Sequence, residues 1–396
     1  MLASRTALIG GSGTSKARGA AKSAIAEGRD IVDLSAGELW AAPPKIVRDA
    51  AAEAIEGGLS RYTDTLGIDP LRHAIAKKVA RRTGQFWEPG EIAMTAGAKQ
   101  ALFNAALAIL NPGDEVIIPQ PYWGTFPAQV KLAGGSPMPL PTYESGYLPR
   151  VEDLVAALTP ATRAVILNTP NNPTGRVYDR DLLAQLAAVA KAHGIWLLFD
   201  ECYDEFVHGP DSHVNLLEVA PEVRPRTLIV NAFSKSLALT GWRLGYLAGP
   251  KEVVTAVRAI QSHTTSNPNV IAQHAVLAYL EAGDDSFLRE TRAHLSFNRT
   301  RGLEILSDLK DVPLPAAEGG FYFYLDLRQV LARLAPQDPP ASADDIAHCL
   351  LAEADVAGVP GNAFGDPTGL RLSYGVATEA LERGLIRLVE VMNGLG

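Results

Sequence analysis

The chain has 396 residues, of which 47% are hydrophobic and 20% are charged, so it can bury a large core and is not a disordered protein. Its 36 basic and 44 acidic residues give a formal net charge of −8, which argues against a nucleic-acid-binding protein. Two cysteines are typical of a reducing, cytoplasmic compartment, and no apolar stretch approaches the roughly 20 residues that span a membrane.

The first 26 residues contain no acidic side chain, and four basic residues lie there among alanine, serine and glycine. This composition is compatible with an organellar transit peptide or with an arm that leads into a helix. We favour the arm, because the sequence passes gradually into a region with ordered patterns.

Helix and strand patterns then alternate along most of the chain. Helices are predicted at residues 45–55, 71–82, 98–110 and 181–192. Short apolar strands are predicted at residues 91–95, 115–118, 164–167, 195–199 and 228–230. This alternation predicts an α/β fold with a largely parallel sheet covered by helices on both faces.

The pattern changes after about residue 268. A long helix is predicted at 286–309, short strands at 321–325 and 370–374, a proline-rich loop at 335–340, and a last helix at 378–392. These elements predict a smaller α+β domain at the C-terminal end.

Polar motifs follow several of the predicted strands. Asn231-Ala-Phe-Ser-Lys-Ser-Leu237 places Lys235 after a buried strand, where desolvation would leave a neutral amine able to attack a carbonyl. Arg243 follows eight residues later and could neutralise a phosphate together with a serine hydroxyl. Taken alone, the Ser-Lys-Ser triplet is weak evidence, and a solvated surface lysine is the default interpretation.

A second motif places Asp200 at the end of a strand and Tyr203 three residues later. Ligands of open α/β sheets bind beyond the carboxyl ends of the strands, so these side chains could contact a pyridinium nitrogen and a phenolic oxygen. A capping aspartate with a packed tyrosine is the structural alternative.

Two further motifs form turns. Asn168-Thr-Pro-Asn-Asn172-Pro-Thr-Gly175 can present an asparagine amide into a cleft, and the strand-to-helix junction at Ala98 and Lys99 offers free backbone N–H groups to a phosphate. The chain has no GxGxxG fingerprint, which disfavours a nicotinamide-binding oxidoreductase, and its eight histidines lack metal-ligand spacing, so no metal is expected.

Together with Thr240-Gly-Trp-Arg-Leu-Gly245, these motifs resemble those of the class I/II aminotransferases, which are fold-type I pyridoxal-phosphate enzymes. The resemblance covers nearly the whole chain and is strongest to the bacterial aspartate aminotransferase subgroup. It implies a large domain with a mostly parallel sheet between helices and a small α+β domain. The predicted division is 1–44 as N-terminal arm and part of the small domain, 45–285 as the large pyridoxal phosphate-binding domain, and 286–396 as the small C-terminal domain.

The resemblance assigns the cofactor contacts residue by residue. Lys235 is similar to the lysine that forms the Schiff base and carries the substrate proton, and Asp200 to the acid that pairs with the pyridine nitrogen. Tyr203 and Asn172 match the donors to the phenolic oxygen, and Trp123 matches the aromatic ring that stacks on the cofactor. The phosphate contacts correspond to Ala98, Lys99, Ser234 and Arg243.

Other positions correspond to the partner subunit and the substrate. Tyr62 matches a tyrosine that reaches the phosphate of the neighbouring subunit, which implies a homodimer with shared active sites. Arg371 matches the arginine that forks onto the substrate α-carboxylate, and Gly37 the backbone that closes over it. Lys99 corresponds to a lysine that meets the distal carboxylate of an acidic substrate, and the expected substrate site also includes Trp123 and Asn172.

The expected function is therefore a ping-pong aminotransferase that moves an amino group between an acidic L-amino acid and a 2-oxo acid. One departure bears on it: where the family usually reads Gly-Glu-Pro-Asp-Phe, this chain has Gly37-Glu-Leu-Trp40-Ala. With this change the substrate could be larger or more aromatic than aspartate, or the same chemistry could lead to elimination, replacement or oxidation. Trp40 could equally be a packing residue between the arm and the small domain. An aminotransferase-like ligand-sensing module without catalysis is the alternative from another class.

Overall fold

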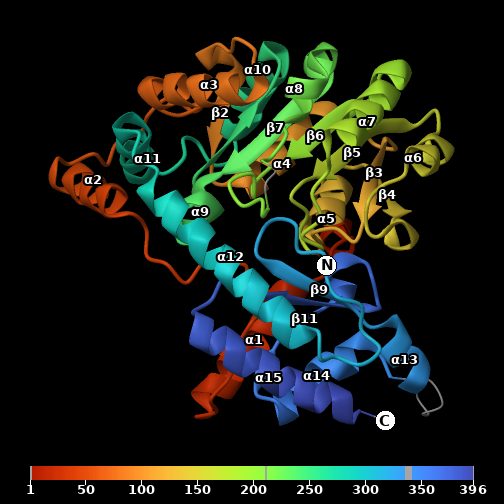
Figure 1. The fold of residues 1–396 in the computed structure, drawn as a ribbon. Coiled ribbons are helices and arrows are strands. Elements are labelled where there is room, and N and C mark those ends of the chain that lie inside the picture. The colour runs from red at the N-terminus through yellow and green to blue at the C-terminus, as the bar shows by residue number, and fades with distance from the viewer. Residues whose placement is uncertain (1, 210–211, 335–340, 396) are drawn as a thin grey trace.

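The computed structural model describes residues 2–209, 212–334 and 341–395, and its centre is a seven-stranded sheet (Figure 1). Among the described strands of this sheet, β8 runs in one direction and the other six run in the opposite direction. In spatial order the strands are β2 (Ile92–Thr95), β8 (Gly245–Ala248), β7 (Thr227–Ala232), β6 (Trp196–Asp200), β5 (Thr162–Asn168), β3 (Glu115–Gln120) and β4 (Ser136–Pro141).

Helices cover both faces of this sheet, and successive side chains of each strand enter different hydrophobic clusters. Val116 and Ile118 of β3 pack with α4, α5 and α10, whereas Ile117 packs with α3, α7 and α11. Burial on both faces explains why the strands are continuous apolar runs. The helices around the sheet are α2 (Lys45–Glu56), α3 (Asp69–Thr83), α4 (Ala98–Ile109), α5 (Thr125–Leu132), α6 (Val151–Ala157), α7 (Arg180–His193), α8 (Leu216–Val219), α9 (Phe233–Ser236), α10 (Lys251–Ser262) and α11 (Val270–Ala282).

A smaller group of elements lies beside the sheet, below it in Figure 1. It contains an antiparallel sheet in the order β11-β12-β9 and a parallel pair, β1 with β10. The strands are β1 (Val32–Asp33), β9 (Tyr322–Asp326), β10 (Val356–Ala357), β11 (Val359–Pro360) and β12 (Gly369–Ser373). The helices are α1 (Gly13–Ala26), α12 (Ser286–Leu306), α13 (Arg328–Leu334), α14 (Ala343–Glu353) and α15 (Thr378–Gly394).

The two ends of the chain meet in this smaller group. Val32 of β1 pairs with Val356 of β10, and helix α1 contacts β10 and β11. In Figure 1 the red helix α1 accordingly lies among the blue C-terminal elements. The segment between β1 and α2 therefore crosses from the smaller group to the main sheet, and this crossing brings residues 35–38 to the carboxyl ends of the central strands.

The fold agrees with the predicted alternation of strands and helices. The predicted strands at 115–118, 164–167, 195–199 and 228–230 are confirmed as β3, β5, β6 and β7. Strand β4 escaped prediction because Pro137, Pro139 and Pro141 interrupt its pattern. It lies at the edge of the sheet, the position where strands tolerate proline. The predicted loop at 335–340 lies outside the described residues.

Two general properties complete the fold. No helix in the described part of the chain is long and apolar enough to cross a membrane. Cys202 and Cys349 are both free thiols.

Candidate active site

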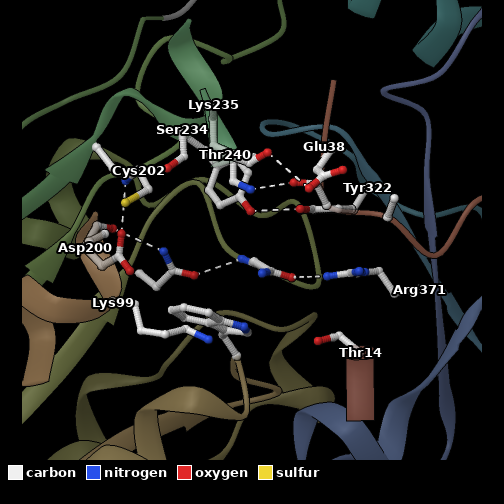
Figure 2. Close-up of a pocket in the computed structure, with 18 of the residues that line it drawn as sticks. Thr14, Glu38, Lys99, Asp200, Cys202, Ser234, Lys235, Thr240, Tyr322 and Arg371 are labelled. Atoms are coloured by element: carbon white, nitrogen blue, oxygen red, sulfur yellow. Dashed lines mark hydrogen bonds between the residues drawn. The ribbon is translucent and has the colours of Figure 1, made fainter. Parts of the chain in front are cut away.

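A cavity of about 500 Å³ opens at the carboxyl ends of β5, β6 and β7, where the main sheet faces β12 and the segment after β1 (Figure 2). With the exception of Tyr62, every site residue predicted from the sequence lines it: Gly37, Ala98, Lys99, Trp123, Asn172, Asp200, Tyr203, Ser234, Lys235, Arg243 and Arg371.

Lys235 stands on the short helix α9 directly after β7, partly buried in the cavity wall. Its Nζ donates a hydrogen bond to the Gly37 carbonyl oxygen. Burial, assisted by the positive charges of Arg371 and Arg243, lowers the pKa of Lys235 to about 8. About a tenth of the amine would therefore be neutral at pH 7, far more than for an ordinary lysine, and the neutral form is the one that a nucleophilic lysine requires.

Asp200 is the last residue of β6 and is 3% exposed. Its Oδ1 accepts a hydrogen bond from the Cys202 backbone N–H at 3.0 Å. Burial raises the pKa of Asp200 to about 6. A carboxyl group held this way favours a cationic partner, because a nearby positive charge would offset the cost of burying the carboxylate.

A row of hydrogen bonds crosses the cavity from Asp200 to Arg371 (Figure 2). The Asn168 side chain donates to the Asp200 carbonyl oxygen at 3.2 Å and accepts from the Asn172 backbone N–H at 2.9 Å. The Asn172 side-chain oxygen accepts from Arg371 Nη1 at 2.9 Å. The row links the main sheet to β12, and Asn168 is the member for which no role was predicted.

Arg371 is 2% exposed, yet its guanidinium is only partly satisfied. Nη2 donates to the Ser35 carbonyl oxygen at 2.8 Å, while Nε finds no hydrogen-bond partner among the described residues. The guanidinium lies over the ring of Tyr322, 4.4 Å from its centroid. A buried, fork-shaped donor of this kind is suited to a carboxylate.

Tyr203 and Tyr322 form a hydroxyl pair beside Lys235. Their oxygen atoms are 2.8 Å apart, and burial raises the pKa of Tyr203 above its ordinary value. Tyr322 also lies close to Gly37, since a Cβ at Gly37 would come within 2.8 Å of the Tyr322 hydroxyl oxygen. Glycine at this position therefore allows the chain to approach the site closely.

The start of α4 and the region after β7 form a cradle of donors. Gly97 precedes the helix with φ of 79°, and a Cβ there would lie 2.7 Å from Nη2 of Arg243. The first N–H groups of α4, at Ala98 and Lys99, have no acceptor within the helix. With the Ser234 hydroxyl and the Arg243 guanidinium, they form a donor set that fits a phosphate group.

Lys99 and Trp123 both line the cavity and contact each other. Lys99 Nζ is 4.9 Å from the centroid of the half-buried Trp123 ring. Desolvation and the charge of Arg243 lower the pKa of Lys99. The lysine has a cation–π contact and no ion pair among the described residues, so its amine is available to an anionic ligand.

The structure adds cavity residues that the sequence did not single out, among them Arg18, Glu38, Thr240 and Tyr322. Arg18 donates to both carboxylate oxygens of Glu38, at 3.1 and 2.7 Å, and Thr240 Oγ1 donates to Oε1 of Glu38 at 3.1 Å. No short-range signal marks Arg18, because it comes from α1 and reaches the site only through the pairing of β1 with β10.

Two aromatic residues that were considered from the sequence lie elsewhere. Tyr62 is 88% exposed and lies outside the cavity of its own chain. Trp40 stacks on His294 of α12 with ring centroids 3.5 Å apart, and it is not among the lining residues. Trp40 thus packs the arm against the smaller group of elements, one of the alternatives considered, and adds no bulk to the cavity. The described residues contain no cluster that could hold a metal ion.

Comparisons with known proteins agree with this geometry. A model of the family "Aminotransferase class I and II" matches residues 29–388. An aspartate aminotransferase of Geobacillus stearothermophilus is 38% identical over 397 residues, and the match covers 99% of this chain and 98% of the relative. An aspartate/prephenate aminotransferase of Cereibacter sphaeroides is 39% identical over 378 residues, and the match covers 95% of this chain and 94% of the relative. The solved aspartate aminotransferase of Thermus thermophilus with maleate superposes with a TM-score of 0.90 at 38% identity, covering 99% of each chain.

Proposed function

Because the chain belongs to the class I and II aminotransferases, whose members depend on pyridoxal phosphate, we propose that it transfers the amino group of an acidic L-amino acid, aspartate or glutamate, to a 2-oxo acid. Family membership makes the protein a pyridoxal phosphate-dependent aminotransferase. The proposal concerns its acidic substrate, the ping-pong order and the residue roles. The observation that carries it is the meeting of Lys235, Arg371 and Lys99 around one cavity.

The donor set of the cavity fits the cofactor. The N–H groups of Ala98 and Lys99, the Ser234 hydroxyl and Arg243 would hold its phosphate, and Asp200 its pyridine nitrogen. Tyr203 and Asn172 would donate to its phenolic oxygen, and Trp123 would cover the ring. The bound cofactor supplies an electron sink for the bonds at the substrate α-carbon. A protonated pyridine nitrogen would hold the pKa of Asp200 below its raised value of about 6, so the acid stays ionised there.

Substrate recognition would use two cationic groups of the cavity, the Arg371 guanidinium and the Lys99 amine. Arg371 would form a bidentate pair with the α-carboxylate. Its bonds to the Asn172 and Ser35 oxygens hold the guanidinium in the cavity, and each Nη atom keeps a second N–H group for the carboxylate. The backbone at Gly37 would close over the same carboxylate. Lys99 would attract the distal carboxylate of aspartate or glutamate, and this contact would discriminate against neutral side chains.

Lys235 would act as the proton carrier. Once the substrate amine has displaced it, Nζ would take the proton from the substrate α-carbon and deliver it to the cofactor carbon C4′. The pKa of about 8 suits this role, because general bases work best when their pKa is near the operating pH. In ping-pong order, the first amino acid would leave as its oxo acid before a second oxo acid collects the amino group.

The assembly proposed is a homodimer in the cytoplasm. Tyr62 is 88% exposed, and Leu59 and Ile55 nearby in the sequence are also exposed, at 38% and 62%. If a second copy covered this region, Tyr62 would reach the phosphate bound in the active site of that second copy. The two free thiols support a reducing compartment. Size-exclusion chromatography with light scattering tests the dimer.

A panel of amino acids tests the substrate. The purified protein with pyridoxal phosphate should be yellow, and aspartate and glutamate should bleach the visible band and yield their oxo acids when an oxo-acid acceptor is present. If only aromatic or basic amino acids react, the role of Lys99 is refuted. Ammonia release without an acceptor would instead identify elimination or oxidation.

A further inference from the structure

The segment from Ser35 to Trp40 supplies oxygen acceptors to three of the cations around the cavity. The Ser35 carbonyl oxygen accepts from Arg371, the Gly37 carbonyl oxygen from Lys235, and the Glu38 carboxylate from Arg18. The position of this segment therefore decides where the Lys235 amine lies.

Glu38 anchors the segment on both sides. Arg18 of α1 forms a two-bond fork with its carboxylate, and Thr240, in the turn before Arg243, donates to the same carboxylate. Figure 2 shows Glu38 and Thr240 joined beside Lys235. Helix α1 contacts the C-terminal strands β10 and β11, so these contacts connect α1 to the main sheet through one acidic side chain.

The carboxylate also lies in the electrostatic surroundings of the lysine. Glu38 favours the charged form of Lys235, and Lys235 favours the ionised form of Glu38. Burial opposes ionisation of Glu38, but the hydrogen bonds and charge of Arg18, the hydrogen bond from Thr240 and the charge of Lys235 together outweigh this cost and lower its pKa. The other titratable and charged groups that face Lys235 are Asp200, Cys202, Tyr203, Arg243, Tyr322 and Arg371.

We propose that Glu38 and Arg18 are positioning residues for Lys235: Glu38 holds the segment whose Gly37 carbonyl oxygen engages the lysine, and Arg18 compensates the charge that Glu38 would otherwise impose on the amine. The inference deepens the site used for the proposed function. Arg18 and Glu38 together set the position of the Lys235 amine and how easily it loses a proton.

Charge compensation predicts opposite effects for the two partners. Arg18→Met leaves the carboxylate uncompensated, which stabilises the ammonium form of Lys235. Glu38→Gln removes the carboxylate and leaves the guanidinium charge, which destabilises the ammonium form. The double variant restores neutrality. A role confined to folding or packing would move both single variants in the same direction.

The readout is the rate at which full-length apoprotein captures added pyridoxal phosphate, followed by the visible band as a function of pH. In this step Lys235 Nζ bonds to the aldehyde carbon, and the aldehyde oxygen leaves as water with two amine protons. Only the neutral amine reacts, so the pH midpoint reports the lysine. Titration of pyridoxal phosphate itself is common to all variants and cancels in the comparison.

We expect the midpoint to rise by about half a pH unit for Arg18→Met, to fall by about as much for Glu38→Gln, and to return close to wild type in the double variant. Arg18→Lys keeps the charge and should keep the midpoint. High salt should shrink both shifts, because the side chains of the pair are 41% and 37% exposed.

Arg29→Met is the matched control. Arg29 also belongs to the N-terminal segment and makes two bonds to Asp355, with side-chain exposures of 35% and 36%, but neither residue lines the cavity. This variant should not move the midpoint.

Shifts in the same direction for Arg18→Met and Glu38→Gln, or no shift in either, would overturn the proposal. If Arg18→Met does not fold, Arg18→Gln takes its place in the comparison. Wild-type protein that never captures pyridoxal phosphate would instead refute the proposed function.

Discussion

The cavity has two halves that the chain builds in different ways. The strand-end half consists of residues that lie in a strand of the main sheet or within a few positions of a strand end: Ala98, Asp200, Tyr203, Ser234, Lys235 and Arg243. The chain-end half consists of Arg18, Gly37, Glu38, Tyr322 and Arg371, which come from the two ends of the chain.

The difference lies in what holds each half in place. Parallel strands with a continuous hydrogen-bonded ladder fix the strand-end half, because each motif residue is within a few positions of a strand end. The chain-end half has a ladder of its own at Tyr322 and Arg371, on β9 and β12, but it is joined to the strand-end half by single polar contacts, such as Thr240 with Glu38 and Asn172 with Arg371. We therefore expect the strand-end half to bind the cofactor rigidly and the chain-end half to select and enclose the substrate.

The largest effect should come from Lys235, the residue at which both halves meet. Lys235→Ala removes the nucleophile and the proton carrier together, so turnover should fall by about 10³-fold or more. Lys191→Ala on the far end of α7 is the control and should change turnover less than about twofold, because its amine is exposed and lies 3.9 Å from Glu222. Turnover of the Lys235 variant within tenfold of wild type would contradict its assigned role.

The second effect separates the halves. Arg371→Lys loses the bidentate fork, so kcat/KM should fall by about 100-fold while the affinity for pyridoxal phosphate stays within about twofold. Arg243→Gln should do the reverse and weaken cofactor affinity by about tenfold, because a charged contact to the phosphate is lost. Equilibrium titration with pyridoxal phosphate and steady-state kinetics measure the two outcomes. If both variants lose cofactor and substrate equally, the halves do not have separate functions.

A smaller, selective effect is expected at Lys99. Lys99→Met keeps the stem over the Trp123 ring but removes the charge, so kcat/KM for aspartate should fall by about tenfold while that for alanine changes little. The ratio of the two specificity constants is the measurement. An unchanged ratio would contradict the proposal that Lys99 binds the distal carboxylate of the substrate.

The smallest effect is expected at Trp40, which belongs to the same segment as Gly37 but lies outside the cavity. Trp40→Ala should leave kcat/KM within about threefold, because the ring stacks on His294 rather than on a ligand. Loss of the stacked pair should lower the melting temperature by about 1–2 °C. A changed substrate range in this variant would show that the segment reaches the substrate after all.

Much of the strand-end half could be predicted from short motifs. Asp200, Lys235 and the asparagine-rich turn each follow a buried apolar run, and a parallel sheet brings the ends of such runs together. Arg371 and Gly37 were predicted only through the family resemblance, because nothing in their local sequence relates them to the distant motifs. Arg18, Glu38 and Tyr322 escaped prediction, since an arginine in a helix or a glutamate in a loop has no local signature.

Local sequence thus decides the elements of this protein and the chemistry at the ends of its strands, because apolar periodicity and turn residues act over a few positions. Only the tertiary structure decides that Val32 pairs with Val356, that Arg371 meets Asn172, and that Trp40 faces His294 instead of the cavity. Each of these contacts joins residues that lie 199 or more positions apart in the sequence. They form because the two chain ends share one hydrophobic core, and the substrate side of the cavity exists only once that core is packed.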